Sequence, residues 1–236
     1  MKKSLIAAGI LTFTGLSAVT TPVLAYQAGD WLVRGRIINV NPNDSSGALR
    51  LDGDRIAKGV GVDSDTVPEL DITYMITPNW GVELILGTSK HTVRANKTVG
   101  SAVSGLGSKN VIDTRVLPPT LTLQYHFRPG ATVRPYVGAG VNYTYFYNEK
   151  VPRSSAIHAT DGSRTKVNLS SSWGWAAQAG VDVAINQDWF INFDVKYLDI
   201  NTTARFKNIN GALGERAKIK ADINPFVWGV GIGRRF

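Results

Sequence analysis

The stretch FVWGVGIGRRF, residues 226–236, decides the fold of this chain because its two faces differ strongly. Its side chains alternate between two kinds, with the period of two residues that a β-strand imposes. The first kind is large and apolar: Phe226, Trp228, Val230, Ile232 and Phe236. The second kind is small or charged: Gly229, Gly231, Gly233 and Arg235. We infer a strand whose larger face is turned toward an apolar medium.

The same alternation recurs in about eight segments, and no stretch shows sustained helical periodicity. The segments are residues 30–40, 67–77, 80–94, 114–127, 134–148, 168–185, 189–205 and 218–236. Short connections lie at 77–80, 128–133 and 186–188, and longer ones, rich in Gly, Ser, Asn and Asp, at 41–66, 95–113, 149–167 and 206–217. Because short and long connections alternate, each kind falls at its own end of the sheet. This layout is typical of an outer-membrane barrel.

The apolar faces of these segments are expected to point outward, into lipid, because eight strands enclose an interior too narrow for so many aromatic rings. Aromatic residues also gather at both ends of the strands, as the two interfaces of a bilayer favour. They are Trp31, Trp80, Phe127, Trp189 and Phe236 at the short-turn end, and Tyr143, Tyr145, Tyr147, Trp173 and Trp175 toward the long loops. We therefore predict an all-β fold, an eight-stranded antiparallel transmembrane β-barrel with short periplasmic turns and long extracellular loops.

Residues 1–25 are typical of a secretory signal peptide, because Lys2 and Lys3 precede a short apolar stretch that ends in a small-residue cleavage site at Ala25. Residues 26–236 are then the barrel itself, in a bacterial outer membrane. The chain has no cysteine, so no disulfide holds it together. Its net charge of +8 is scattered, without a dense basic cluster, and favours a surface facing solvent or anionic lipid over one that binds nucleic acid.

The inward faces carry charges of both signs near the short-turn end. The residues are Arg34, Arg36, Glu69, Asp71, Glu83, Asp182, Asp194, Lys196 and Arg235, with Gln124 and His126 among them. Opposed charges can neutralise one another in a low-dielectric lumen. We predict a salt-bridged plug that fills the small barrel, in preference to an aqueous pore.

Inward positions nearer the long loops are apolar, at Ile38, Ile85, Leu198 and Ile200. They form either the lining of an apolar pocket or ordinary packing beneath the loops. At the same level the stretch VLPPTLTLQYHF, residues 116–127, contains Pro118 and Pro119, which cannot donate a ladder hydrogen bond. Two interpretations stay open: a local split in the barrel wall, or a strand end above the bilayer, where proline does no harm.

Five stretches together make the chain resemble the OmpW family of small outer-membrane proteins. They are AGDWLVRGR (28–36), LPPTLTLQYHF (117–127), PYVGAGVNYTYFY (135–147), DVKYLDI (194–200) and INPFVWGVGIGRRF (223–236). The resemblance covers essentially the whole of residues 26–236, although Arg234 stands where the family more often has an aromatic residue. It implies a channel for passive uptake of small hydrophobic molecules, with a pocket open to the outside and a lateral gate near Pro118 and Pro119.

The partners expected on this reading are small hydrophobic solutes, outer-membrane lipids and lipopolysaccharide, for a barrel that acts as a monomer. The terminal Phe236 resembles the assembly signal that the barrel-assembly machinery reads. An alternative is a structural or interaction barrel, whose loops serve as an adhesion, phage or toxin receptor surface. An enzyme is disfavoured because no nucleophile with a base is evident, and the spacing of the three histidines predicts neither a metal site nor a cofactor.

Overall fold

The computed structural model describes residues 24–43, 45–46, 48–51, 54–58, 60–95, 110–155, 165–208 and 216–236. The predicted signal peptide lies outside the described residues except for its last two positions. Among the residues described, no helix is long and apolar enough to cross a membrane.

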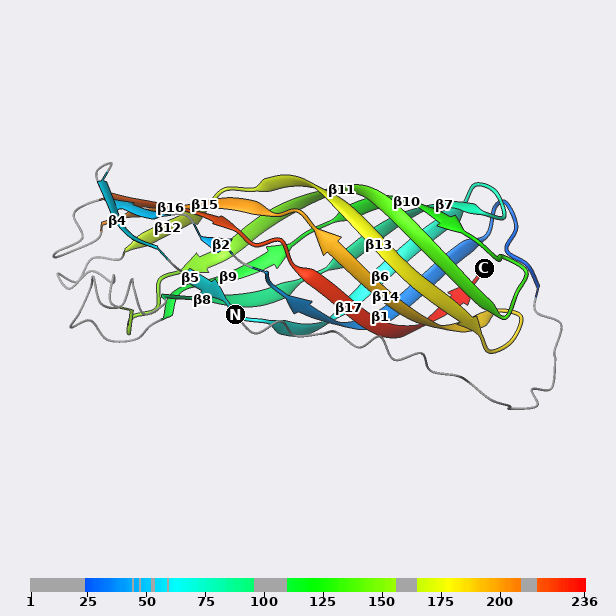
Figure 1. Ribbon diagram of the computed structural model, residues 1–236. Helices are drawn as coiled ribbons and strands as arrows, with labels where there is room; N and C mark the ends of the chain where they lie inside the picture. Colours follow the sequence, from blue (N-terminus) through cyan, green and yellow to red (C-terminus); the bar gives the residue numbers. More distant parts are fainter. Residues whose placement is uncertain are drawn as a thin grey trace, which may run out of the picture.

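Eight antiparallel strands form a closed barrel (Figure 1). They are β1 (Trp31–Asn41), β6 (Asp65–Met75), β7 (Trp80–Gly87), β10 (Thr120–His126), β11 (Val133–Lys150), β13 (Ser172–Ala184), β14 (Trp189–Leu198) and β17 (Phe226–Arg235). The last strand, β17, pairs with β1, so the two ends of the chain close the cylinder. At this seam the N–H of Trp31 donates to the carbonyl of Phe236 at 3.0 Å, and the N–H of Phe236 donates back at 2.8 Å. The predicted eight-stranded barrel is confirmed.

The strands continue past the barrel as two smaller sheets at the long-loop end, on the left of Figure 1. One sheet contains β5 (Val60–Val62), β8 (Ser89–Ala95) and β9 (Asn110–Leu117), beside the end of β11. The other contains β2 (Ser45–Ser46), β3 (Ala48–Leu51), β4 (Asp54–Lys58), β12 (Lys166–Leu169), β15 (Asn201–Lys207) and β16 (Arg216–Asp222). We call the eight-stranded part the lower barrel and these two sheets the upper extension.

Five of the predicted segments are each divided in two between the lower barrel and the upper extension. The breaks fall at residues 88, 118–119, 170–171, 199–200 and 223–225. The prediction of one continuous strand is therefore wrong for residues 80–94, 168–185 and 189–205. Residues 114–127, where the prolines already suggested an interruption, and residues 218–236 are divided as well. Two breaks contain proline, which removes a ladder donor, and one of these also contains Asn224 at a positive φ of 38°.

The side chains reverse their distribution across these breaks. At four of the five breaks the same parity of residues faces inward on both sides, whereas across 170–171 it shifts from odd (Leu169) to even (Ser172). On β14 and β15 the even-numbered residues point inward throughout; they are polar at 192, 194 and 196, and mostly apolar at 198–206. The outward residues change in the opposite sense, from Val195 and Tyr197 to Arg205 and Lys207. The lower barrel therefore presents an apolar surface to lipid, whereas the upper extension buries its apolar side chains and presents polar ones to water.

The predicted aromatic residues lie on the outside of the lower barrel, at both of its ends. Trp31, Trp80, Phe127, Trp189 and Phe236 are exposed beside the short turns or the C-terminus, and Tyr145, Trp173 and Trp175 are exposed toward the upper extension. Neighbouring rings pack against one another across strands, as Trp31 does with Tyr74 at 4.9 Å between ring centroids. These rings mark the two levels at which the barrel meets the interfaces of a bilayer.

The seam between β1 and β17 generates a prediction about Phe236. Deleting this residue removes the last backbone pair of the seam and an exposed ring at the short-turn interface. We expect the chain to be exported but to assemble poorly, with a marked fall in the heat-modifiable band on unboiled gels of outer membranes. Phe236→Tyr keeps both the backbone pair and the ring, and should assemble like the parent. A normal amount of folded barrel from the deletion variant would contradict the role of Phe236.

Candidate functional site

Two arginines from β1 occupy the centre of the lower barrel. Arg34 is fully buried, and its Nη2 lies 2.8 Å from Oδ2 of Asp182 on β13. Its Nη1 donates to Oγ1 of Thr73 at 2.6 Å and lies 3.4 Å from Oε1 of Glu83 on β7. The guanidinium therefore ties the first strand to the opposite wall, because Asp182 belongs to a strand that does not neighbour β1.

Arg36 makes the second centre of the same network. Its Nε lies 3.1 Å from Oε1 of Glu69, its Nη2 contacts Asp71, and its Nη1 lies 3.4 Å from Oδ1 of Asp194. Lys196 pairs with Glu69 and with Asp194, which closes the cluster on the β14 side. The network unites eight of the predicted lumen residues: Arg34, Arg36, Glu69, Asp71, Glu83, Asp182, Asp194 and Lys196. Three cations thus neutralise most of the charge of five carboxylates.

Neutral side chains complete this network, and none of them is among the predicted plug residues. The hydroxyl of Tyr136 donates to Asp194 at 2.8 Å, and Nδ2 of Asn192 donates to Asp182 at 2.7 Å. Nε2 of Gln178 donates to Glu83 at 2.7 Å. All three residues have the inward parity of their strands, so alternation alone could have identified them.

Tyr26 closes the lumen beneath the charged network and is not among the predicted site residues. It is fully buried, its hydroxyl donates to Oδ2 of Asp182 at 3.0 Å, and the guanidinium of Arg134 lies 4.1 Å from its ring centroid. Its ring also packs against His126 and Phe190. Burial, and next the nearby Asp182 carboxylate, raise the pKa of the Tyr26 phenol, which keeps it a hydrogen-bond donor. Tyr26 precedes the first strand, so no periodicity marks it.

Arg235 does not join the network, in contrast to the prediction. Its Nη1 donates to the carbonyl of Ala25 at 3.0 Å and lies 3.8 Å from Asp30, and its Nη2 lies 3.9 Å from Asp188. Its parity is inward, but it stands at the last position of β17, where the side chain reaches the rim and not the centre. Arg235 therefore belongs to the short-turn edge of the barrel.

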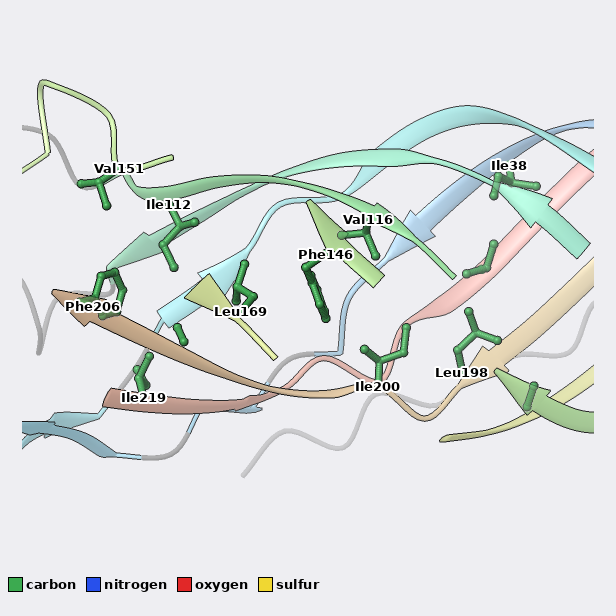
Figure 2. Close-up of a cluster of buried hydrophobic side chains, with 13 residues drawn as sticks. Ile38, Ile112, Val116, Phe146, Val151, Leu169, Leu198, Ile200, Phe206 and Ile219 are labelled. Carbon is green, nitrogen blue, oxygen red and sulfur yellow. The ribbon is translucent and has the colours of Figure 1, made fainter. Parts of the chain in front are cut away.

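An apolar cluster fills the space above the charged network (Figure 2). It includes Ile38, Leu198 and Ile200 from the predicted set. The end of β11 contributes Phe146, and Val151 follows it; the upper extension contributes further members: Ile112, Val116, Leu169, Ala204, Phe206 and Ile219. Ile85 is also buried but lies outside this cluster, at the level where β7 pairs with Thr120 of β10. Three of the four predicted residues are thus brought together.

Pro118 and Pro119 lie at the boundary between the charged network and the apolar cluster. The ladder between β7 and β10 ends at Ile85 and Thr120, and the ladder between β8 and β9 begins at Ser89 and Val116 in the same register. Residues 86–88 and 117–119 therefore face each other between two ladders. On the other side, the N–H of Tyr143 donates to the carbonyl of Pro119 at 3.0 Å, so contact with β11 persists. The carbonyl of Pro118 accepts the hydroxyl of Thr120 at 2.9 Å instead.

Comparison with known proteins gives a consistent picture. The profile of the OmpW family matches residues 27–236. Outer membrane protein W of Vibrio cholerae is 36% identical over 230 residues, which cover 97% of both chains. The dibenzothiophene metabolism operon protein PahQ of Pseudomonas aeruginosa is 28% identical over 94% of this chain and 95% of its own length. The crystal structure of the outer membrane protein OprG from Pseudomonas aeruginosa superposes with a TM-score of 0.81 at 33% identity, covering 91% of this chain and 99% of that one.

The charged network generates a prediction about stability. Arg36→Met leaves Glu69, Asp71 and Asp194 without their shared cation, and removing one partner from buried ion pairs costs about 3–5 kcal/mol. We expect a loss of that size in the free energy of unfolding, measured by tryptophan fluorescence during urea unfolding of the barrel in lipid vesicles. Arg235→Met is the matched control, because its long rim contacts are worth about 1 kcal/mol or less. Equal losses from both variants would contradict a special role for the network.

Tyr26 generates a second prediction, about ion conductance. Tyr26→Ala removes the ring that closes the lower end of the lumen, so ion conductance in planar bilayers should rise above that of the parent. Tyr26→Phe keeps the ring and loses only the hydrogen bond to Asp182, so its conductance should stay low. If the alanine variant conducts no better than the phenylalanine variant, the closure lies elsewhere.

Proposed function

This chain belongs to the OmpW family of outer-membrane proteins, and on that premise we propose that it is an outer-membrane channel for passive uptake of small hydrophobic molecules. The observation that carries the proposal is the change of chemistry along the inner face. The inner face is apolar in the upper extension and charged in the lower barrel, with the prolines at the boundary.

An apolar solute gains no free energy by moving downward from the apolar cluster into the charged network. To pass Arg34 and Arg36 it would have to separate buried ion pairs while offering them no hydrogen bonds, which costs several kcal/mol per group. The surrounding membrane, by contrast, is as apolar as the solute. The direction of lowest free energy from the apolar cluster is therefore sideways, through the wall of the barrel.

In this proposal the wall parts at Pro118 and Pro119, which act as a lateral gate. Backbone groups of successive strand residues point to opposite neighbours, so Pro119, whose carbonyl accepts from Tyr143, faces β11. Pro118 then faces Gly87 and lacks the N–H that would close the wall on that side. Ile38, Leu198 and Ile200 line the pocket, and Ile85, beside the end of the ladder, lines the way out.

The relatives support this assignment. PahQ is named as a protein of a dibenzothiophene metabolism operon, and dibenzothiophene is a small molecule without charge or hydrogen-bond donors. A barrel for such solutes needs an apolar entrance and an exit into lipid in place of a water-filled pore. Both requirements agree with a charged lower lumen that is closed to apolar solutes.

Uptake of labelled apolar solutes by lipid vesicles that contain the refolded protein tests the function. Saturable uptake, faster than that of empty vesicles and blocked by excess unlabelled solute, is the expected result. Uptake no faster than in empty vesicles would contradict the proposal and favour the interaction barrel, whose loops would then be tested for adhesion, phage or toxin binding.

The lateral gate generates a prediction that separates the two prolines. Pro118→Val restores a donor toward Gly87, and a ladder hydrogen bond there is worth about 0.5–1.5 kcal/mol net. Stability should rise or hold, while solute uptake falls and the amount of barrel in the outer membrane stays the same. Pro119→Val restores a donor only toward β11, where contact is already present, so it should reduce uptake less. If Pro118→Val assembles normally and transports like the parent, the lateral route is wrong.

A further inference from the structure

Five exposed cations gather on the outer surface of one sheet of the upper extension. They are Lys166 on β12, Arg205 and Lys207 on β15, and Lys218 and Lys220 on β16. Antiparallel pairing sets Lys166 directly opposite Lys207, and Arg205 directly opposite Lys218. We call these five residues the cationic face. They come from three separate parts of the sequence, which is why the linear sequence shows no dense basic cluster.

The cationic face is poorly neutralised by the protein itself. Within the part of the chain that the structure describes, no carboxylate lies within ion-pair distance of any of the five side chains, whereas Arg94 on the other sheet of the extension pairs with Asp63 at 2.7 Å. Like charges directly opposite each other destabilise a pair of strands. Such a surface therefore gains stability from a bound anion that carries several negative charges.

The height of the cationic face above the membrane narrows the choice of anion. Arg205 lies eight residues beyond Tyr197, and Lys218 lies eight residues before Phe226, both of which belong to the lipid-facing surface. At about 3.3 Å per residue this is about 26 Å along a strand, or roughly 20 Å of height for a strand tilted by about 40°. The headgroup layer of an ordinary phospholipid extends only roughly 5–8 Å beyond the hydrocarbon. The phosphate of an ordinary phospholipid therefore lies too close to the hydrocarbon to reach the cationic face.

We propose that the cationic face binds the phosphorylated core oligosaccharide of lipopolysaccharide. This headgroup is a glycan that rises well above the hydrocarbon and carries several phosphates, so it matches both the charge and the height. Lysine and arginine side chains bind phosphate through charge-assisted hydrogen bonds. The outward residues between the cations, Asn168 and Thr203, add groups suited to sugar hydroxyls. This surface lies outside the barrel wall and is independent of solute transport.

Binding of purified lipopolysaccharide to the full-length barrel in phosphatidylcholine vesicles tests the proposal. The test variant replaces Arg205, Lys207 and Lys218 with glutamine. We expect at least about tenfold weaker binding, since each cation near such a surface contributes about a factor of five, with the folded, heat-modifiable band unchanged because these side chains are exposed. The matched control replaces Lys90, Arg94 and Arg115, exposed on the other sheet, by glutamine and should keep the parent affinity.

Three ligands distinguish the sources of the phosphate. Lipopolysaccharide with its phosphorylated core should bind tightly, and the same material after chemical removal of the core phosphates should bind about as weakly as the test variant does. The affinity for lipid A without a core should differ little between the parent and the test variant. An unchanged affinity of the test variant would overturn the proposal. So would an equal loss in the control variant, a loss for lipid A as large as that for the complete molecule, or full displacement by inorganic phosphate at millimolar concentration.

Discussion

The narrow space inside eight strands, and the two arginines that must fit there, constrain most of this structure. Arg34 and Arg36 project from β1 into a lumen where an unpaired charge is prohibitively costly, so carboxylates from β6, β7, β13 and β14 converge on them. The glycines of β17 follow from the same requirement. A Cβ atom at Gly231 would lie 2.7 Å from Cγ of Arg36, and one at Gly233 would overlap the ring of Phe190. The stretch that decides the fold is therefore small on one face because its two neighbours, β1 and β14, carry large side chains there.

Filling the lower lumen with charge leaves the upper part of the molecule to provide the apolar interior. Strands β14 and β15 keep their parity through the break between them, yet the side chains they bury change from ionic to aliphatic between Lys196 and Leu198. The lower barrel is thus charged inside and meets lipid outside, whereas the upper extension is apolar inside and meets water outside. The breaks in the strands fall where these two parts meet, which allows them to adopt different curvature and pairing.

Alternation predicted the barrel, the lipid-facing rings and the inward charges, because a period of two residues is a local property of the chain. It could not predict contacts that depend on how far along the barrel axis a residue lies. Arg235 has inward parity but lies at the end of its strand, and Ile85 is buried but lies outside the apolar cluster. Tyr26 is not part of a strand, so alternation does not mark it, and its position is fixed by Arg134 and Asp182 from distant strands. Four of the five strand breaks leave the parity of the inward residues unchanged, so alternation alone does not reveal them.

Strand β11 runs from Val133 to Lys150 without a break, beside a wall that is interrupted at the prolines. It pairs with β10 below that interruption and with β9 above it, in the same register as far as Tyr147 and with a shift between Tyr147 and Lys150. Residues 117–119 on one side of the interruption are therefore attached to β11, and Leu86 and Gly87 on the other side pair with Leu70 and Glu69 of β6. Any widening of the wall there would separate a segment held by β11 from a segment held by β6. Strands β8 and β9 continue these two segments upward and pair with each other, so a solute that passed sideways would also strain the sheet directly above the interruption.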